Sequence, residues 1–237
     1  MIEWLIALGI GLTISVIIYS LSFSIMMIVK KKGKMKSNIV HSNPWMTSAV
    51  VSPFVLLLSF AAIFFLSSGS LQLWGFQIPS VSTITLLGSI GLIVACIILF
   101  VSEHLSPTPD KMNPPEDRRS RVLFFIFIVL LASVSEEILF RGFLQNILDN
   151  TILFQINFEW FSITSGAIVS AILFGLIHVA PAKQMGLSVP VLSFSAMILG
   201  LFAGIFLTIS GSLILPIMLH IEFNFVGFML GISSKSP

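Results

Sequence analysis

Seven long apolar segments dominate the chain and limit what it can fold into. They cover residues 4–29, 46–67, 81–101, 122–148, 161–180, 189–208 and 212–232. A helix needs about 20 apolar residues to cross the hydrocarbon core of a bilayer, and each segment is close to that length. Only 9% of the 237 residues are charged, whereas a soluble domain carries about 25%. The sequence therefore predicts an all-α, polytopic membrane helix bundle with about seven transmembrane helices.

The positions of the basic residues predict how this bundle sits in the membrane. Of the 12 Lys and Arg residues, five lie within 30–36, four lie within 102–121, and single lysines stand at 183 and 235. With seven spans, all of these positions fall on one side of the bilayer. Because Lys and Arg accumulate in cytoplasmic loops, we expect the N-terminus outside and the C-terminus in the cytoplasm. We expect no cleavable signal peptide, because no basic residue precedes the first apolar segment.

The chain divides into two regions by the placement of its intramembrane charges. Residues 1–121 hold the first three transmembrane helices and the cytoplasmic loops, and residues 122–237 form a second helical bundle that holds most of these charges. Segment 149–160 (DNTILFQINFEW) is expected to lie along the membrane interface, with Trp160 and Phe161 as anchors. The Lys, Ile and Phe content is typical of a bacterial protein, so we expect a multi-pass protein of the bacterial plasma membrane.

The fourth apolar segment contains the stretch SVSEEILFRGF at 133–143, which carries three charges. A charge at mid-bilayer costs about 2.5–3.5 kcal/mol on insertion scales, so such residues persist where they pair, face a cavity or do chemistry. Glu137 and Arg141 are four residues apart and share a helix face, which predicts a structural ion pair. Glu136 points about 100° away from Glu137 and is left for another use.

Two later segments add polar groups to this one. His178 follows Phe174 by one turn in FGLIH, and His220 precedes Asn224 by one turn in HIEFN. A carboxylate, two histidines and an amide suit activation of water, with Glu136 taking the proton and the histidine and amide N–H groups stabilising an oxyanion. Two histidines and a glutamate are also a known catalytic zinc set, which leaves a metal site formed by Glu136, His178 and His220 open.

Structural roles compete with these functional ones. A lone intramembrane histidine often serves an interhelical hydrogen bond, and Asn224 alone would most often do the same. Phe174 is one of 22 phenylalanines, so packing is its default role. Glu222 points to nearly the opposite helix face from His220 and receives no role from the sequence.

In this order, EEILFR, FGLIH and HIEFN resemble the EExxxR, FxxxH and HxxxN motifs of the CPBP intramembrane protease family. This family includes the CAAX prenyl proteases of type II and bacterial relatives in bacteriocin processing and self-immunity (Abi). The resemblance covers about residues 120–232. It implies that 122–237 is a CPBP-like catalytic helical bundle that hydrolyses peptide bonds within the membrane.

The resemblance also implies a role for each motif residue. Glu136 would activate water with the help of His178, and His220 and Asn224 would form the oxyanion site. The family is often labelled as metalloproteases, and a metal-free glutamate mechanism has also been argued for it. The cofactor therefore stays open between none and zinc.

The expected function is that of an intramembrane glutamate-dependent protease or metalloprotease. Its expected partners are the lipid bilayer and a membrane-associated peptide or protein substrate, such as a leader or signal peptide, and no nucleic acid. Two other functions stay open. One is a non-catalytic relative that binds peptides, for instance in self-immunity, and the other is a small proton-coupled transporter that relays protons through buried Glu and His side chains.

Overall fold

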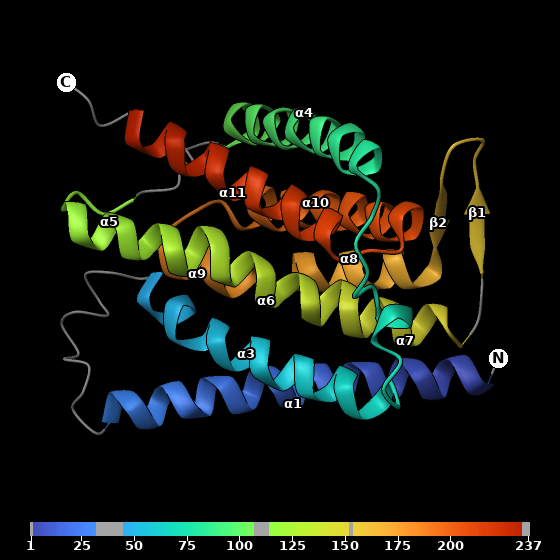
Figure 1. Cartoon of the computed structure of the whole chain (residues 1–237). Helices are drawn as coiled ribbons and strands as arrows, with labels where there is room; N and C mark the ends of the chain where they lie inside the picture. The colour runs from blue at the N-terminus through green and yellow to red at the C-terminus, as the bar shows by residue number, and fades with distance from the viewer. Residues whose placement is uncertain (1, 32–44, 107–113, 152–153, 234–237) are drawn as a thin grey trace.

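The computed structural model is a bundle of helices with one short β-hairpin (Figure 1). It describes residues 2–31, 45–106, 114–151 and 154–233. Within these residues, seven helices are long and apolar enough to cross a membrane, which confirms the predicted fold class. The side of the membrane on which each terminus lies stays a prediction. The seven spans are Ile2–Ile28, Trp45–Leu66, Val81–Leu105, Arg118–Asp149, Ser165–Met185, Val189–Ser210 and Ile214–Ser233.

The other six spans are each built on one helix or on two consecutive helices, with a short 3-10 turn and a hairpin in the connections. In chain order the elements outside the fourth span are α1 (Ile2–Lys31), α3 (Trp45–Leu66), η1 (Leu71–Trp74), α4 (Val81–Leu105), β1 (Gln155–Asn157), β2 (Ser162–Thr164), α8 (Ser165–Ile177), α9 (Val179–Met185), α10 (Val189–Ser210) and α11 (Ile214–Ser233).

The fourth span is irregular, because two π-helical stretches alternate with α-helical ones. Its parts are α5 (Arg118–Phe124), η2 (Phe125–Ala132), α6 (Ser133–Glu137), η3 (Ile138–Gln145) and α7 (Asn146–Asp149). Asn146 Nδ2 donates to the carbonyl oxygens of Arg141 and Gly142, at 3.0 Å each, and so satisfies backbone acceptors near the end of η3. Departures from α-helical geometry of this kind are frequent at functional sites.

Polar caps set the ends of two spans, which therefore differ from the apolar segments. Asp117 accepts a hydrogen bond from Ser120 N at 2.8 Å, so the fourth span begins at Arg118 and not at 122. This bond lowers the pKa of the Asp117 carboxyl, so the cap persists at neutral pH and is lost as the pH falls through that lowered value. Thr164 caps α8 in the same way by accepting from Ala167 N at 3.1 Å.

Segment 149–160 contains half of a hairpin, which the sequence did not indicate. Strands β1 and β2 pair antiparallel, with Gln155 opposite Thr164. The rings of Phe158 and Phe161 stack at 4.7 Å between centroids, and Trp160 is 82% exposed at the turn. The placement of this segment at the membrane interface stays a prediction.

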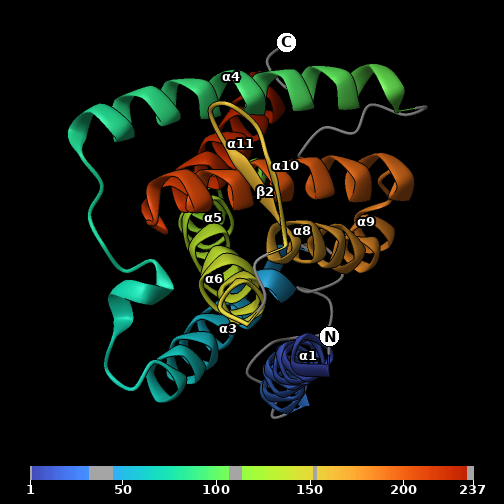
Figure 2. The ribbon, with the colours of Figure 1, turned by 90° about the vertical axis from the view of Figure 1, so that its right-hand side faces the viewer.

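The fourth span lies at the centre of the bundle. Figure 2 shows α6 nearly end-on, with α3, α8 and α11 around it. Helices α3 and α11 contact α6 directly, and α8 contacts η3. Helix α10 packs along α8, α4 covers α10 and α11, and α1 packs against α3 and the far end of the fourth span. All residues of η3 are buried in this arrangement, so this part of the fourth span is surrounded by protein and can hold a charge.

Glycines on α10 allow this helix to approach the charged part of the fourth span. A Cβ atom at Gly200 would lie 2.6 Å from Arg141 Nη2, and a Cβ atom at Gly204 would lie 2.8 Å from Ala167 Cβ. Gln145 Nε2 also donates to the carbonyl oxygen of Gly204 at 3.2 Å. Small residues four apart are typical of close helix contacts in membranes.

We predict that Gly204→Ala destabilises the bundle. The added methyl group overlaps Ala167, and overpacking of this kind costs about 1–3 kcal/mol. The matched control is Gly9→Ala on α1, because a Cβ atom there meets nothing within 4 Å. Thermal unfolding in detergent should show a lower midpoint for Gly204→Ala only, and equal midpoints for the two variants would contradict the packing argument.

Candidate active site

A fully buried carboxylate, Glu137, joins the fourth span to α11. Arg141 Nη1 donates to Glu137 Oε1 at 3.1 Å, which is the ion pair that the four-residue spacing predicts. The same oxygen accepts a hydrogen bond from His220 Nδ1 at 2.8 Å. Glu137 and Arg141 are both 0% exposed. Because Glu137 accepts from His220 Nδ1, it also directs the opposite ring nitrogen, Nε2, away from itself.

Phe174 on α8 connects the charged groups of three helices. The Arg141 guanidinium lies 4.6 Å from the centroid of its ring, in the position of a cation–π contact. The His220 ring meets it edge-on at 5.5 Å, and the His178 ring lies 4.7 Å away. Phe174 therefore packs, as its abundance indicated, but it packs against both histidines and the arginine.

Glu136 has a different environment from its neighbour Glu137. Its side chain is 22% exposed, and it makes no hydrogen bond to another described side chain. The His220 ring is near it, with Nε2 4.0 Å from Glu136 Oε2. Glu136 lines a cavity of about 370 Å³, together with His178. One glutamate of the pair is thus committed to an ion pair, and the other faces open space.

His178 lies where the fifth span changes from α8 to α9. Its Nδ1 lies 2.7 Å from the carbonyl oxygen of Phe174 and donates a hydrogen bond to it. The other ring nitrogen, Nε2, takes no part in this bond. The span continues to Met185 and not to 180 as the apolar segment indicated, so His178 lies well inside it. The fourth span is 32 residues long, or about 48 Å at 1.5 Å per residue. It therefore extends beyond the bilayer core, which is about 30 Å thick. Glu136 and His178 both line the same cavity.

His220 lies close to Glu136, but neither His220 nor Asn224 lines this cavity. His220 is 4% exposed. Asn224 Nδ2 donates to Ser133 Oγ at 2.9 Å, and Ser133 Oγ in turn donates to the carbonyl oxygen of Val129 at 2.8 Å. Ser133 and the Glu137–His220 bond have no signal in the sequence, because both depend on how α11 packs against α6.

The first two spans supply the other walls of the cavity. Tyr19 and Phe23 come from α1, and Val51 and Val55 come from α3, while α9 contributes a wall that includes Pro181. None of these residues stands in a motif, so sequence reasoning did not find them. A tertiary arrangement of three distant segments is needed to bring them together.

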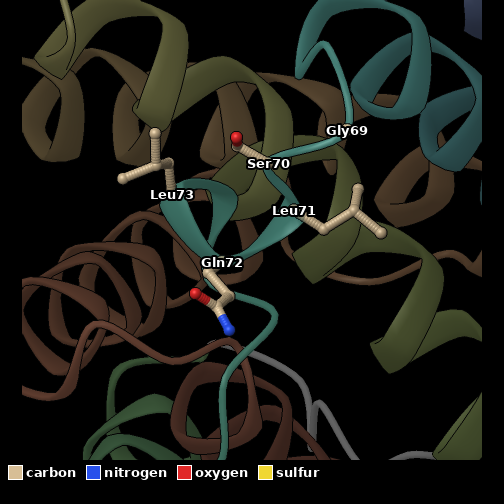
Figure 3. Close-up of a pocket in the computed structure, with 5 residues that line it drawn as sticks. All are labelled: Gly69, Ser70, Leu71, Gln72 and Leu73. Carbon is tan, nitrogen blue, oxygen red and sulfur yellow. The ribbon is translucent and has the colours of Figure 1, made fainter.

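A second hollow of the surface, of about 580 Å³, lies at η1 and is of a different kind. It is formed by the single turn Gly69–Leu73. Figure 3 shows the side chains of Leu71, Gln72 and Leu73 pointing away from one another, and none of the labelled residues is titratable. It lacks the convergent polar groups of a reactive site.

Glu222, to which the sequence assigned no role, lies outside the cavity. A Cβ atom at Gly91 of α4 would be 2.6 Å from Glu222 Oε2, so this carboxylate packs against the glycine face of α4. It is therefore an intramembrane glutamate that is separate from Glu136 and Glu137.

A zinc site at Glu136 would depend on how the possible ligands are arranged around it. Within the described part of the chain, no three His, Cys, Asp or Glu side chains form a group that could hold a metal ion. His220 Nδ1 is engaged by Glu137, and His178 Nδ1 by a backbone carbonyl. These bonds engage only Nδ1, and a histidine that binds a metal commonly donates its other ring nitrogen to a carboxylate or a backbone carbonyl, so both Nε2 atoms stay available and the cofactor stays open between none and zinc.

Comparison with known proteins gives an independent finding on this region. Residues 118–226 match the model of the family described as type II CAAX prenyl endopeptidase Rce1-like, of the CPBP group. This confirms the resemblance seen in the three motifs. The chain is also 25% identical over 167 residues to an uncharacterized 24.3 kDa protein of Escherichia coli, covering 67% of this chain and 71% of the relative. No solved structure matches the chain.

We predict that the two adjacent glutamates differ in their effect on folding. Glu137→Gln leaves the buried Arg141 without its counter-charge, and breaking a buried pair costs about 3–5 kcal/mol. Glu136→Gln removes a partly exposed carboxylate that has no such partner. Folded yield after membrane extraction, measured by size-exclusion chromatography, should fall for Glu137→Gln and stay at the wild-type level for Glu136→Gln. The reverse order of yields would overturn this division between the two residues.

Proposed function

We propose that this chain, whose residues 118–226 match the model of the type II CAAX prenyl endopeptidase Rce1-like family, is an intramembrane endopeptidase with Glu136 as the group that activates water. The observation that carries the proposal is the contrast between two neighbours. Glu137 is fully buried and paired, whereas Glu136 faces a cavity that it shares with His178. A carboxylate that makes no hydrogen bond to a described side chain and is in reach of water suits a general base.

The proposed reaction begins with a water molecule in the cavity. Glu136 accepts one of its protons while the water oxygen forms a bond to the carbonyl carbon of the scissile peptide. The C–N bond then breaks, and the proton on Glu136 passes to the leaving nitrogen. The products are a carboxylic acid and an amine, and the acid then releases its proton to water. His178 assists from the same cavity, where its ring is held by the bond from Nδ1 to the Phe174 carbonyl.

The oxyanion of the tetrahedral intermediate needs hydrogen-bond donors that are already in place. We assign this role to the His220 ring, whose Nε2 lies 4.0 Å from Glu136 Oε2, and to the amide hydrogen of Asn224 that is not donated to Ser133. Glu137 holds the His220 ring from the opposite side, and Ser133 holds Asn224. Both donors are thus oriented by buried partners, which reduces the reorganisation needed during the reaction.

The walls of the cavity support a membrane-associated peptide as the substrate. Among the described residues that line it, Glu136 is the sole acidic side chain, and none is Lys or Arg. Apolar walls of this kind favour an uncharged, extended segment of a substrate. Processing of a leader or signal peptide fits such a segment, and bacteriocin processing is one form of it.

We predict that Glu136→Gln abolishes cleavage. Loss of a general base lowers the rate by about 10²–10⁴-fold. The matched control is Glu222→Gln, since Glu222 is an intramembrane glutamate that packs against α4 and not in the cavity. The assay uses purified full-length protein and a library of internally quenched, uncharged decapeptides, and Glu222→Gln should cleave them at the wild-type rate. Equal activity of wild type and Glu136→Gln would refute the proposed base.

Two further arms of this assay separate the alternatives. Cleavage that a chelator abolishes and zinc restores would contradict a metal-free glutamate mechanism and return the histidines to the role of ligands. Peptide binding without cleavage by the wild type would favour a non-catalytic, peptide-binding relative, as in self-immunity. Proton flux in proteoliposomes, lost in Glu136→Gln, would favour a transporter.

A further inference from the structure

The chain has one tyrosine, and it lies at the proposed catalytic cavity. Tyr19 stands on α1, far outside the residues that match the protease family. Its hydroxyl oxygen is buried and has no hydrogen-bond partner among the described residues. Because a buried hydroxyl without a partner is unfavourable, its presence calls for an explanation.

The surroundings of Tyr19 place this hydroxyl near the reacting groups. Its ring packs on Phe140 of η3, with 6.4 Å between the centroids and a tilt of 47°. The hydroxyl is within electrostatic range of Glu136, Arg141 and Glu137. Helix α1 is therefore more than a lipid-facing cover, because it presents one polar group to the centre of the bundle.

Hydrogen-bond donors beside Glu136 are largely engaged by other groups. His178 Nδ1 donates to a backbone carbonyl, and the hydroxyl of Ser135, next to Glu136, donates to the carbonyl oxygen of Ala132 at 2.9 Å. On α3, the hydroxyl of Ser52 donates to the carbonyl oxygen of Ser48 at 2.8 Å. A peptide that enters the cavity brings carbonyl oxygens, and each of these needs a donor. The Tyr19 hydroxyl can donate its hydrogen to such an oxygen, because it has no other partner among the described residues.

We infer that Tyr19 is a substrate-positioning residue, whose hydroxyl donates a hydrogen bond to a main-chain carbonyl oxygen of the bound peptide and so holds the peptide against Glu136. The inference rests on the proposed endopeptidase function. It gives α1 a role in substrate binding that the match over residues 118–226 does not contain. A main-chain carbonyl is present in every peptide, so this contact positions the substrate without selecting its sequence.

The first test is Tyr19→Phe, which removes the hydroxyl and keeps the ring that packs on Phe140. The value of kcat/KM for decapeptide cleavage should fall about tenfold or more, because a misplaced peptide reacts slowly. The thermal unfolding midpoint without peptide should stay unchanged or rise, because the lost hydroxyl had no partner to lose. The control is Ser24→Ala, which removes an exposed hydroxyl from the same helix and should leave both values unchanged.

The outcomes distinguish this inference from the proposed function. Cleavage by wild type and Tyr19→Phe at equal rates, with Glu136→Gln inactive, overturns the role of Tyr19 and leaves the protease intact. A lower unfolding midpoint in Tyr19→Phe, with a loss of activity in proportion to folded protein, identifies a structural hydroxyl and also overturns it.

The second test does not depend on turnover. Because the chain has a single tyrosine, labelling tyrosine with 13C at Cζ gives an NMR signal from Tyr19 alone. In the full-length Glu136→Gln variant, an unquenched decapeptide from the same library should shift this signal in a saturable manner. A signal that stays fixed while the peptide demonstrably binds, as followed by fluorescence anisotropy, contradicts contact between Tyr19 and the substrate.

Discussion

The structure depends on one buried network, in which Glu137 accepts from both Arg141 and His220. The pair with Arg141 lies within one helix, but the bond to His220 ties the fourth span to α11. Neither charge reaches solvent, so each is tolerable only because the other is present. The glycine at 200 makes room for the guanidinium, and Phe174 covers it with its ring face. Helices α8, α10 and α11 are thus arranged around a single arginine.

This network explains how a membrane helix accepts two adjacent glutamates. Consecutive residues on a helix point about 100° apart, so the two carboxylates enter different environments. Glu137 enters the network and is neutralised there. Glu136 enters the cavity, and His220 Nε2 lies 4.0 Å from its Oε2. A second acidic residue at this position would be costly without chemistry to perform, which is why we place the reaction at Glu136.

The sequence was sufficient for the features that depend on local spacing. Hydropathy alone located seven spans, and the four-residue spacing placed Glu137 next to Arg141, as the structure has them. The first residues of the fourth and fifth spans differ from the predicted ones, because Asp117 and Thr164 cap the N-termini of their helices and hydropathy does not detect such caps. The contact of His220 with Glu137 and the hairpin after the fourth span depend on tertiary packing, and no pattern of residues in the sequence predicted them.

The cavity also bears on how the chain divides into working parts. The predicted division at residue 121 lies close to the start of the family match at residue 118, and the motif residues all lie after both positions. The cavity is lined by residues from both sides of that division, because α1 and α3 form walls of the cavity that Glu136 lines. Residues 118–226 by themselves would leave the carboxylate open on that side, with neither apolar walls nor the Tyr19 hydroxyl. Under the proposed function, the reacting groups come from the matched region, and a bound substrate would also contact the walls that α1 and α3 form.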